Sequence, residues 1–373
     1  MVHQTKDYPI HFRYFKNNMQ SIAVLIPLVP GADVVNEPCE GIMLYSFASQ
    51  QAQDVFHEVA CSKYRPMFIA GGPHPSARPE ETLRFFDYVV IGEGEETLPE
   101  LIKILQNRGD VSSVRGIAFK EKERIVFTEK REPITLDSYP PFGCNGIRST
   151  IEITRGCPFL CAYCQTPQLF GHIVRHRSMD EIVRYSKYLK DVRFTSPNAF
   201  AYGSDGIRPR VEKIEALLKK LPRKNIFFGT FPSEVRPEFI NDRILELVSE
   251  HCANTTVSMG GQSGSQRVLD VIKRGHTVDD IITGVEKCLQ HGFTPVVDFI
   301  FGLPGETEED QLETLRLIQW LTGKGGKVHS HYFMKLPGTG FENSDPAPLS
   351  VQVEKTMGKL ALAGKTTGVW SKA

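Results

Sequence analysis

The stretch TRGCPFLCAYCQ (154–165) brings three cysteines, Cys157, Cys161 and Cys164, onto one short segment. A glycine before the first cysteine and a proline after it indicate a loop rather than a packed strand. Three thiolates on one loop can bind three irons of a [4Fe–4S] cluster, so that the fourth iron lacks a protein ligand. An iron with a free position can bind and activate a substrate. The stretch therefore predicts an iron–sulfur centre in the catalytic site of an α/β enzyme.

Zinc is the alternative ion for the same three thiols. A structural zinc site requires four ligands, and His172 or His176 could supply the fourth. The spacing leaves this alternative open but favours the cluster, which needs no further residue from the chain.

The composition indicates a folded chain of two domains. Of its 373 residues, 40% are hydrophobic and 24% are charged, and 44 Lys plus Arg balance 44 Asp plus Glu. A neutral chain has no general attraction for nucleic acid or an anionic membrane, so we expect neither as a partner. No apolar run is long enough to cross a bilayer and residues 1–10 lack the apolar stretch of a signal peptide, so a cytoplasmic protein is expected.

Short apolar runs alternate with helical stretches over the first part of the chain. Strands are predicted at 21–29, 41–47, 67–72 and 87–93, with a β-hairpin at 116–130. Such alternation is typical of a doubly wound parallel sheet with helices on both faces. The proline-rich stretch 133–143 does not continue the pattern, and we place the end of this Rossmann-like domain at residue 140 (domain 1–140).

A second alternating series predicts a partial (β/α)6 barrel over residues 141–337. Its strands are expected at 149–156, 191–197, 225–232, 254–261, 294–302 and 327–336. Spacing alone does not separate this barrel from a second open sheet. The three cysteines directly follow the first of these strands, where α/β folds place their reactive loops. Residues 338–373 are expected to form a short C-terminal extension.

The cysteine motif resembles that of the radical S-adenosylmethionine (SAM) superfamily, which has three cysteines at this spacing and an aromatic residue before the third, here Tyr163. The stretches VSMGGQSGSQRVLDVIKRGHT (257–277) and DFIFGLPGETEEDQLET (298–314) resemble the fourth- and fifth-strand regions of the subgroup with methylthiotransferases and cobalamin-dependent enzymes. The resemblance implies that the open iron chelates the methionine part of SAM. It also implies that an electron from the cluster cleaves SAM to a 5′-deoxyadenosyl radical.

The same resemblance implies a set of SAM contacts. They are Tyr163, Ser196, Asn198, Gln262, Ser263, Arg274, Ile300, Phe301 and Gly302. Ser196 and Asn198 occupy the place of the family's glycine-rich amine-binding motif without reproducing it. For each of these side chains, ordinary packing within the barrel is the alternative.

The stretch MFIAGGPHPSARPEETLRFFDYVVIGEGEETLPEL (67–101) resembles the cobalamin-binding domain that precedes many radical SAM barrels. Glycines end two adjacent predicted strands and let the backbone approach a ligand closely, although a tight turn without a ligand is the alternative. The resemblance implies that cobalamin is lined by Ser46, Phe47, Gly71, Gly72, Pro73, His74, Gly92, Glu93, Gly94 and Glu95. The Asp-x-His-x-x-Gly motif that gives cobalt a histidine is absent, so we expect cobalamin to bind without that histidine.

Together the resemblances imply a cobalamin-dependent radical SAM C-methyltransferase of an archaeal branch, with a [4Fe–4S] cluster, SAM and cobalamin as cofactors. No side chain is assigned as a general acid or base, because hydrogen abstraction by a radical requires neither. The implied substrate is a peptide or protein, such as a glutamine of methyl-coenzyme M reductase, or a small molecule. The implied electron donor is a ferredoxin or flavodoxin.

Three other functions stay open on the sequence. One is radical chemistry without methyl transfer, such as cyclisation or rearrangement, and another is a cobalamin or redox sensor without turnover. The third is a methylthiotransferase acting on tRNA. The neutral charge and the short stretch after residue 337 weigh against tRNA.

Overall fold

The computed structural model describes residues 8–144 and 146–371, and the chain divides into two compact units. The border lies between Thr150 and Ile151, whereas the sequence analysis placed it after residue 140. Ile147 packs against the core of the first unit, and the Thr150 hydroxyl donates to Gln20 Oε1 at 3.0 Å. These contacts tie the end of the linker to the first unit.

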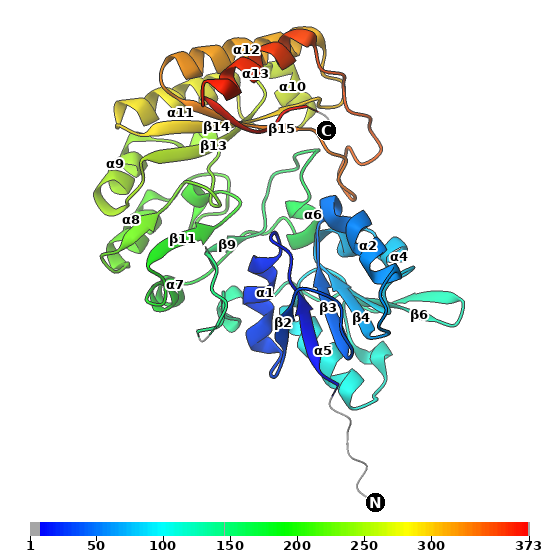
Figure 1. Ribbon diagram of the computed structural model, residues 1–373. Coiled ribbons are helices and arrows are strands. Elements are labelled where there is room, and N and C mark those ends of the chain that lie inside the picture. Colours follow the sequence, from blue (N-terminus) through cyan, green and yellow to red (C-terminus); the bar gives the residue numbers. More distant parts are fainter. Residues whose placement is uncertain (1–7, 145, 372–373) are drawn as a thin grey trace, which may run out of the picture. The chain divides into compact units, whose positions relative to one another are not determined.

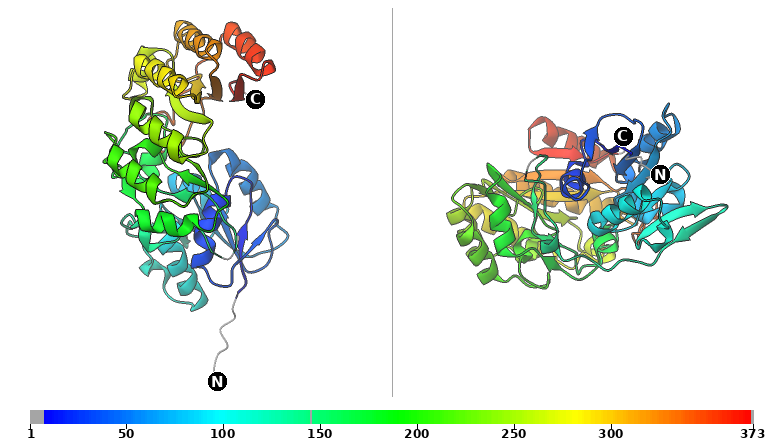
Figure 2. Two further views of the ribbon diagram at one scale, coloured as in Figure 1. Left: turned by 90° about the vertical axis from the view of Figure 1, so that its left-hand side faces the viewer. Right: turned by 90° about the horizontal axis from the view of Figure 1, so that it is seen from below.

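The first unit is built on one seven-stranded sheet of order β2-β1-β3-β4-β5-β6-β7. Its strands are β1 (Ile10–Arg13), β2 (Asp33–Val35), β3 (Ile42–Ser46), β4 (Met67–Gly71), β5 (Tyr88–Val90), β6 (Ile117–Glu121) and β7 (Arg124–Phe127). The first five are parallel. The last two form an antiparallel hairpin that projects from the edge of the sheet (Figure 2).

Helices cover both faces of this sheet, as predicted for a doubly wound domain. They are α1 (Met19–Leu25), α2 (Ala52–Ala60), α3 (Pro73–Ala77), α4 (Pro79–Thr82) and α5 (Gly94–Gln106), with 3₁₀ turns at Ile26–Leu28, Ser49–Gln51, Val111–Ser113 and Leu136–Ser138. Ile42 and Leu44 of β3 belong to one apolar core, and Met43 and Tyr45 belong to the other. Alternate residues of a strand point to opposite faces, so a strand buried on both sides is apolar throughout.

The strand predicted at 21–29 is wrong. These residues form helix α1 and the 3₁₀ turn that follows it. A short apolar run does not reveal by its period whether it is a buried strand or a buried helix. The place beside β3 is taken by β1, in which Ile10 pairs with Ile42. The sequence analysis predicted neither β1 nor β2.

The second unit contains the predicted series of parallel strands. They are β8 (Ile151–Glu152), β11 (Asp191–Thr195), β12 (Asn225–Phe227), β13 (Thr256–Gln262), β14 (Thr294–Phe301), β15 (Lys327–Tyr332) and β16 (Thr366–Val369). They form sheets of order β12-β11-β8 and β13-β14-β15-β16, and a parallel bridge between Val235 and Met259 joins the segment after β12 to β13. The predicted partial barrel is therefore confirmed, and β16 extends it beyond β15.

Helices alternate with these strands. They are α6 (Thr166–Phe170), α7 (Met179–Ser186), α8 (Val211–Lys220), α9 (Asp242–His251), α10 (Gln266–Val271), α11 (Val278–Gln290), α12 (Glu308–Gly323) and α13 (Val351–Leu362), with 3₁₀ turns at Ala199–Ala201 and Pro237–Phe239. Two short strands, β9 (Thr154–Arg155) and β10 (Arg175–His176), pair antiparallel. Because α13 packs on α12 and β16, much of the stretch 338–373 belongs to the second unit.

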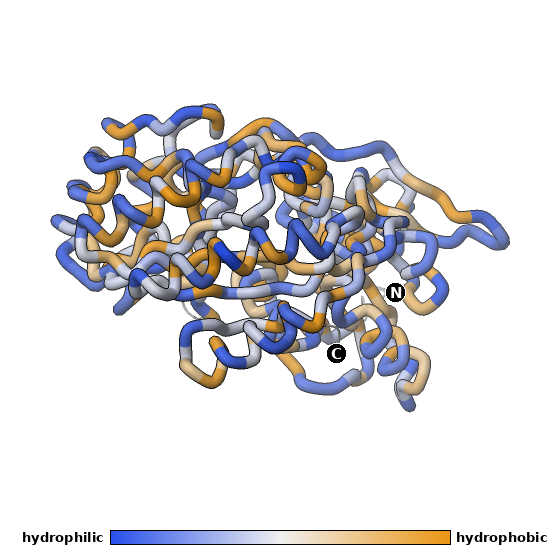
Figure 3. The backbone as a smooth tube through the Cα atoms, turned by 90° about the horizontal axis from the view of Figure 1, so that it is seen from above, coloured by the Kyte–Doolittle hydropathy of each residue, from blue (hydrophilic) through white to orange (hydrophobic). Residues whose placement is uncertain are grey.

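The strands β13–β15 have one face covered by helices. Helix α11 packs on β13 and β14, and α12 packs on β15 (Figure 1). Met259, Val297 and Val328 are completely buried, and a Cβ added to Gly284 of α11 would lie 3.4 Å from Met259 Sδ. We call this the helix-covered face and the opposite side the inner face. Hydrophilic and hydrophobic stretches alternate along the helices (Figure 3), as expected when one side of each is buried.

None of the helices within the described ranges has both the length and the apolar character needed to span a membrane.

Candidate active site

The three cysteines lie on the loop between β9 and α6 of the second unit. Gly156 opens this loop with φ +86°, and a Cβ at this position would lie 2.3 Å from the Ile173 carbonyl oxygen. Only glycine fits such a backbone without a clash. Further along, Ala162 N donates to Ile272 O at 2.9 Å, which fastens the loop to the end of α10.

The cysteines are free thiols that lie close enough to influence one another. Burial raises the pKa of Cys157, and the charges of Cys164 and Cys161 raise it further, whereas the Phe159 N–H lowers it. Cys161 is buried. Thiols that oppose one another's ionisation in this way favour a cation between them, and three thiolates suit an iron–sulfur cluster.

No group of three or more His, Cys, Asp or Glu side chains surrounds a single metal position in residues 8–144 and 146–371. The three thiolates of a [4Fe–4S] cluster bind three different irons, so their sulfurs need not converge on one point.

Two arginines place positive charge at the cysteine loop. The Arg236 guanidinium stacks on the Phe159 ring, 3.4 Å from its centroid. Arg274 donates through Nη1 to Cys161 Sγ at 3.7 Å and through Nη2 to Gly260 O at 2.8 Å. Arg274 Nε is buried and has no partner among the described residues. Arg274 therefore links the loop to β13 and keeps one donor for a ligand.

Tyr163 precedes the third cysteine. Burial raises its pKa, and the neighbouring Cys161 and Cys164 add to the increase while Arg274 opposes it. The phenol therefore stays neutral at physiological pH.

Gln262 and Ser263, two predicted SAM contacts, follow each other at the end of β13. Gln262 has φ +72°, which is uncommon for a residue with a side chain, and the pairing of β13 with β14 shifts between Gly260 and Gln262. Strained backbone of this kind is often found at functional sites. Ser263 is completely buried, and its hydroxyl accepts from Ser265 N at 3.1 Å, which gives it a local structural role.

Ser196 and Asn198 lie buried after β11. Ser196 Oγ accepts from Asn198 N at 3.2 Å, and Asn198 Oδ1 accepts from Arg236 N at 3.4 Å. Within the described part of the chain, Asn198 Nδ2 is buried without an acceptor. A ligand oxygen would remove the free-energy cost of this unpaired donor, so this residue fits a SAM contact.

Ile300 and Phe301 end β14, and Gly302 follows it. Phe301 is completely buried, whereas Ile300 is partly exposed. Gly302 has φ +77°, and a Cβ there would lie 2.5 Å from the Tyr332 ring. Its N–H donates to Glu306 Oε2 at 2.7 Å, so Glu306 holds the turn after the strand.

Glu234, Asp298 and Glu306 are buried or partly buried acids that the sequence analysis did not single out. A signal existed for Asp298, because it interrupts the apolar strand TPVVDFIF (294–301). Nothing in the local sequence marks Glu234.

The candidate cobalamin residues at the ends of β3 and β4 lie together in the first unit. Gly72 has φ +96°, and a Cβ there would lie 2.9 Å from Ser46 Oγ and 3.0 Å from Phe47 N. Phe47 N donates to Gly71 O at 3.2 Å, and His74 N donates to Phe47 O at 3.2 Å. Such a close approach of backbone at the carboxyl ends of parallel strands fits the edge of a large cofactor.

His74 and Pro73 belong to α3, and the His74 ring points into the core. The ring is 6% exposed, and its centroid lies 5.8 Å from that of Phe47 and 5.7 Å from that of Phe56. Burial lowers the pKa of His74, so the ring is neutral. Its position among aromatic rings makes it a packing residue of this unit.

The second candidate turn joins β5 to α5. Gly92 has φ +81° and open space where a Cβ would lie. Glu93 Oε2 accepts from Ile134 N at 2.8 Å, so this carboxylate holds the linker. Gly94 begins α5, and Glu95 in its first turn is buried.

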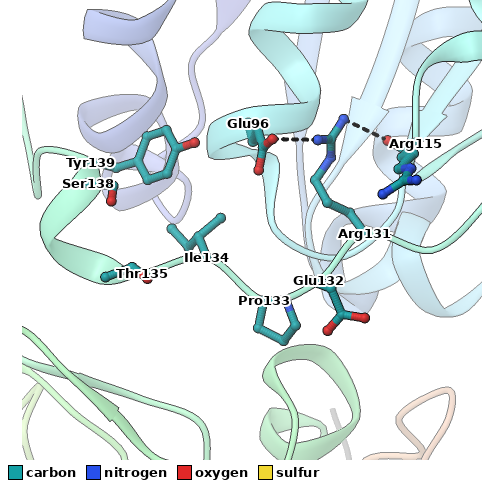
Figure 4. Close-up of a pocket in the computed structure, with 9 residues that line it drawn as sticks. All are labelled: Glu96, Arg115, Arg131, Glu132, Pro133, Ile134, Thr135, Ser138 and Tyr139. Carbon is teal, nitrogen blue, oxygen red and sulfur yellow. Dashed lines mark hydrogen bonds and ion pairs between the residues drawn. The ribbon is translucent and has the colours of Figure 1, made fainter.

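A pocket of about 300 Å³ adjoins this linker in the first unit (Figure 4). It is lined by Glu96, Arg115, Arg131, Glu132, Pro133, Ile134, Thr135, Ser138 and Tyr139. The Arg131 guanidinium pairs with Glu96 at 2.7 Å and donates to Arg115 O at 3.5 Å (Figure 4). Because this charge is already paired and no predicted cobalamin contact lines the pocket, we assign it no ligand.

Family models match both units. Residues 151–318 match the radical SAM superfamily, and residues 36–102 match the B12 binding domain.

Similar proteins agree with these matches. An uncharacterized protein of Methanopyrus kandleri is 26% identical over 364 residues, covering 83% of this chain and 68% of the relative. An uncharacterized methyltransferase of Pyrococcus horikoshii is 26% identical over 279 residues, covering 68% of this chain and 58% of the relative. A tRNA-2-methylthio-N(6)-dimethylallyladenosine synthase of Moorella thermoacetica is 29% identical over 247 residues, covering 62% of this chain and 51% of the relative. The chain thus spans from about half to two thirds of the length of these relatives.

Solved structures share the architecture at low sequence identity. The radical SAM methyltransferase TsrM of Kitasatospora setae, with cobalamin and a [4Fe–4S] cluster bound, superposes with a TM-score of 0.68 at 14% identity, covering 90% of this chain and 74% of TsrM. The cobalamin-dependent SAM radical enzyme OxsB, with aqua-cobalamin and SAM bound, gives a TM-score of 0.64 at 14% identity (97% and 56%). Residues 151–318 are therefore a radical SAM domain, and residues 36–102, ahead of it, are a B12-binding domain.

Proposed function

We propose that this protein is a cobalamin-dependent radical SAM methyltransferase that methylates an unactivated carbon. The observation that carries the proposal is the pairing, in one chain, of a three-cysteine loop in the second unit with a B12-binding domain in the first. A B12-binding domain would hold the cobalamin that carries the methyl group in such a reaction.

The residues present suit the cofactors that this function requires. Cys157, Cys161 and Cys164 would hold the [4Fe–4S] cluster. Asn198 and Arg274, each with a buried unpaired donor, would contact SAM. In the first unit, the turn at Gly72 would face cobalamin. When bound, these groups supply a 5′-deoxyadenosyl radical and a methyl group that can be transferred.

The protein's own residues position this site and shield it. Gly156 gives the cysteine loop its path, and Arg236 clamps the loop through Phe159. Arg274 donates to Cys161 Sγ and so directs a positive charge at this cluster ligand. Burial of Cys161 keeps water from this ligand.

For the substrate we propose a peptide, with the α-carbon of a glutamine in methyl-coenzyme M reductase as the first candidate. The resemblance to an archaeal branch supports it, and the relatives from Methanopyrus kandleri and Pyrococcus horikoshii agree with that branch alone. A ferredoxin or flavodoxin is the proposed electron donor. The neutral net charge argues against tRNA, although one relative is a tRNA-modifying enzyme by name.

The proposal is tested with protein purified without oxygen and reconstituted with iron, sulfide and hydroxocobalamin. SAM, a strong reductant and a synthetic glutamine peptide are then added. The readouts are the electron paramagnetic resonance signal of the cluster, the corrin absorbance after desalting, 5′-deoxyadenosine and a methylated peptide by mass spectrometry.

Wild-type protein is expected to retain corrin and to form both products, and the Cys157/Cys161/Cys164→Ala variant is expected to form neither product. Deoxyadenosine without retained corrin would contradict methyl transfer from cobalamin. Absence of a cluster signal would contradict the radical mechanism itself.

A further inference from the structure

Two carboxyl groups, those of Glu234 and Asp298, lie on the two segments that flank β13 in the second unit. Val235 forms a parallel β-bridge with Met259, and Met259 pairs with Val297. These three residues therefore form one row across the sheet, on the helix-covered face to which Met259 points. Neighbouring residues along extended backbone point to opposite sides. Glu234 and Asp298, which adjoin this row, therefore point to the inner face.

Neither carboxyl group has a protein partner. No hydrogen bond or ion pair joins the Glu234 or Asp298 side chain to another group in residues 8–144 and 146–371. Asp298 is only 8% exposed. Buried carboxyl groups are nearly always paired, because an unpaired one loses its hydration without compensation. The pair therefore lacks donors that a ligand would supply.

The charges of the two groups act on each other. The pKa of Asp298 is raised to about 8, first by burial and then by the charge of Glu234, while Arg274 opposes the increase. Burial also raises the pKa of Glu234, with Arg274 again opposing. At pH 7 Asp298 therefore carries a proton, so its carboxyl can donate a hydrogen bond as well as accept one.

Arg274 connects the pair to the cysteine loop. Its charge acts on both carboxyl groups, yet its hydrogen bonds go to Gly260 O and Cys161 Sγ. The pair thus lies on the side of the barrel where the reaction centre is expected. Because Asp298 is neutral at pH 7 and the positive charge of Arg274 acts on both carboxyl groups, the pair favours a neutral polar ligand over a full cation.

We propose that Glu234 and Asp298 bind a neutral carboxamide of the methyl acceptor, with its N–H donating to one carboxyl and its C=O accepting from the other. This inference rests on the proposed function and specifies the class of substrate. A carboxylate in the same position would be repelled by an ionised carboxyl group of the pair. An ammonium group could donate to the pair but could not accept from Asp298, and the charge of Arg274 would oppose it.

The test measures binding, so it does not depend on methyl transfer. The probes are a blocked glutamine dipeptide and its blocked glutamate and lysine counterparts, titrated by ligand-observed NMR into full-length protein with the cluster reconstituted. SAM affinity and SAM cleavage without peptide are measured in parallel. The variants are Glu234→Gln, Asp298→Asn and the double variant, with Glu246→Gln on the exposed side of α9 as the matched control.

We expect wild-type protein and the control to bind the glutamine probe in preference to the other two. The double variant should bind it roughly tenfold more weakly or worse, with SAM affinity changed by less than about threefold. The iron content and circular dichroism spectrum of each variant show that it is folded.

Three results would overturn the assignment. The first is wild-type protein that does not prefer the glutamine probe, including protein that binds none of the probes. The second is unchanged glutamine binding by the double variant. The third is an equal loss of SAM affinity, which would assign the pair to SAM. Failure of the proposed function appears differently, as carboxamide binding without a methylated product.

Discussion

Burial gives Glu306 an unusual titration. It raises the pKa of this carboxyl to about 7, although the Gly302 N–H and Gln311 lower it. In the unfolded chain the group would titrate near 4.5. Between these values the folded state holds a proton that the unfolded state has lost, so stability falls as pH rises from 4.5 to 7.

Glu306→Gln removes this titration and keeps an oxygen that accepts from the Gly302 N–H. From pH 5 to pH 8 we expect wild-type protein to lose roughly 2 kcal/mol more stability than the variant. Thermal midpoints measured across this range provide the check. Parallel curves for the two proteins would show that Glu306 is ionised throughout.

Arg274 should tune the cluster through its contact with Cys161 Sγ. Positive charge and hydrogen bonds to ligand sulfur stabilise the more negative, reduced form of a cluster. Arg274→Met should lower the reduction potential by some tens of millivolts, about what one hydrogen bond is worth. A redox titration without SAM measures this. Arg243→Met, at an exposed site on α9, should leave the potential unchanged.

At the scale of an element, the cysteine loop depends on Gly156. A Cβ there would meet the Ile173 carbonyl oxygen, whereas Gly171, with φ +80°, has no atom within 4 Å of its Cβ position. Gly171→Ala should lower the free energy of unfolding by about 1 kcal/mol because of its backbone conformation. Gly156→Ala should lower it by roughly 2–4 kcal/mol and cause loss of bound iron. Iron content and thermal midpoint of both variants test this. Equal effects would show that steric contact is unimportant.

Cobalamin binding should depend in the same way on the glycine in the turn between β4 and α3. Gly72→Ala places a methyl group against Ser46 and Phe47, and we expect cobalamin retention to fall by about tenfold or more. Gly31→Ala has a similar φ, +80°, but open space around it, and should retain cobalamin. Corrin absorbance after desalting distinguishes them. Normal retention by Gly72→Ala would place the corrin elsewhere.

At the scale of the whole molecule, the first unit has an apolar core on each face of its sheet and should fold independently of the second. A fragment of residues 1–150 is expected to unfold cooperatively and to retain hydroxocobalamin, and it should bind no iron. Circular dichroism melting and corrin absorbance are the measurements. Retention by the full chain alone would mean that the B12-binding domain needs the second unit to complete its site.

How far the sequence predicted the fold also differs between the units. In the second unit every predicted barrel strand is present, because amphipathic helices with clear caps separate the strands. In the first unit the apolar run at 21–29 was taken as a strand, and β1 and β2 were missed. Short runs lack the length needed to reveal their period.

The sequence by itself determined the local chemistry: three thiols on a loop that begins with glycine, and glycines at successive strand ends. These depend only on neighbours along the chain, whose distances the backbone limits. The tertiary structure alone decided that Arg274 reaches Cys161, that His74 is enclosed by aromatic rings, and that Glu234 and Asp298 lie on the segments that flank β13. Contacts between distant residues depend on strand register and side-chain burial, which arise only when the sheet assembles.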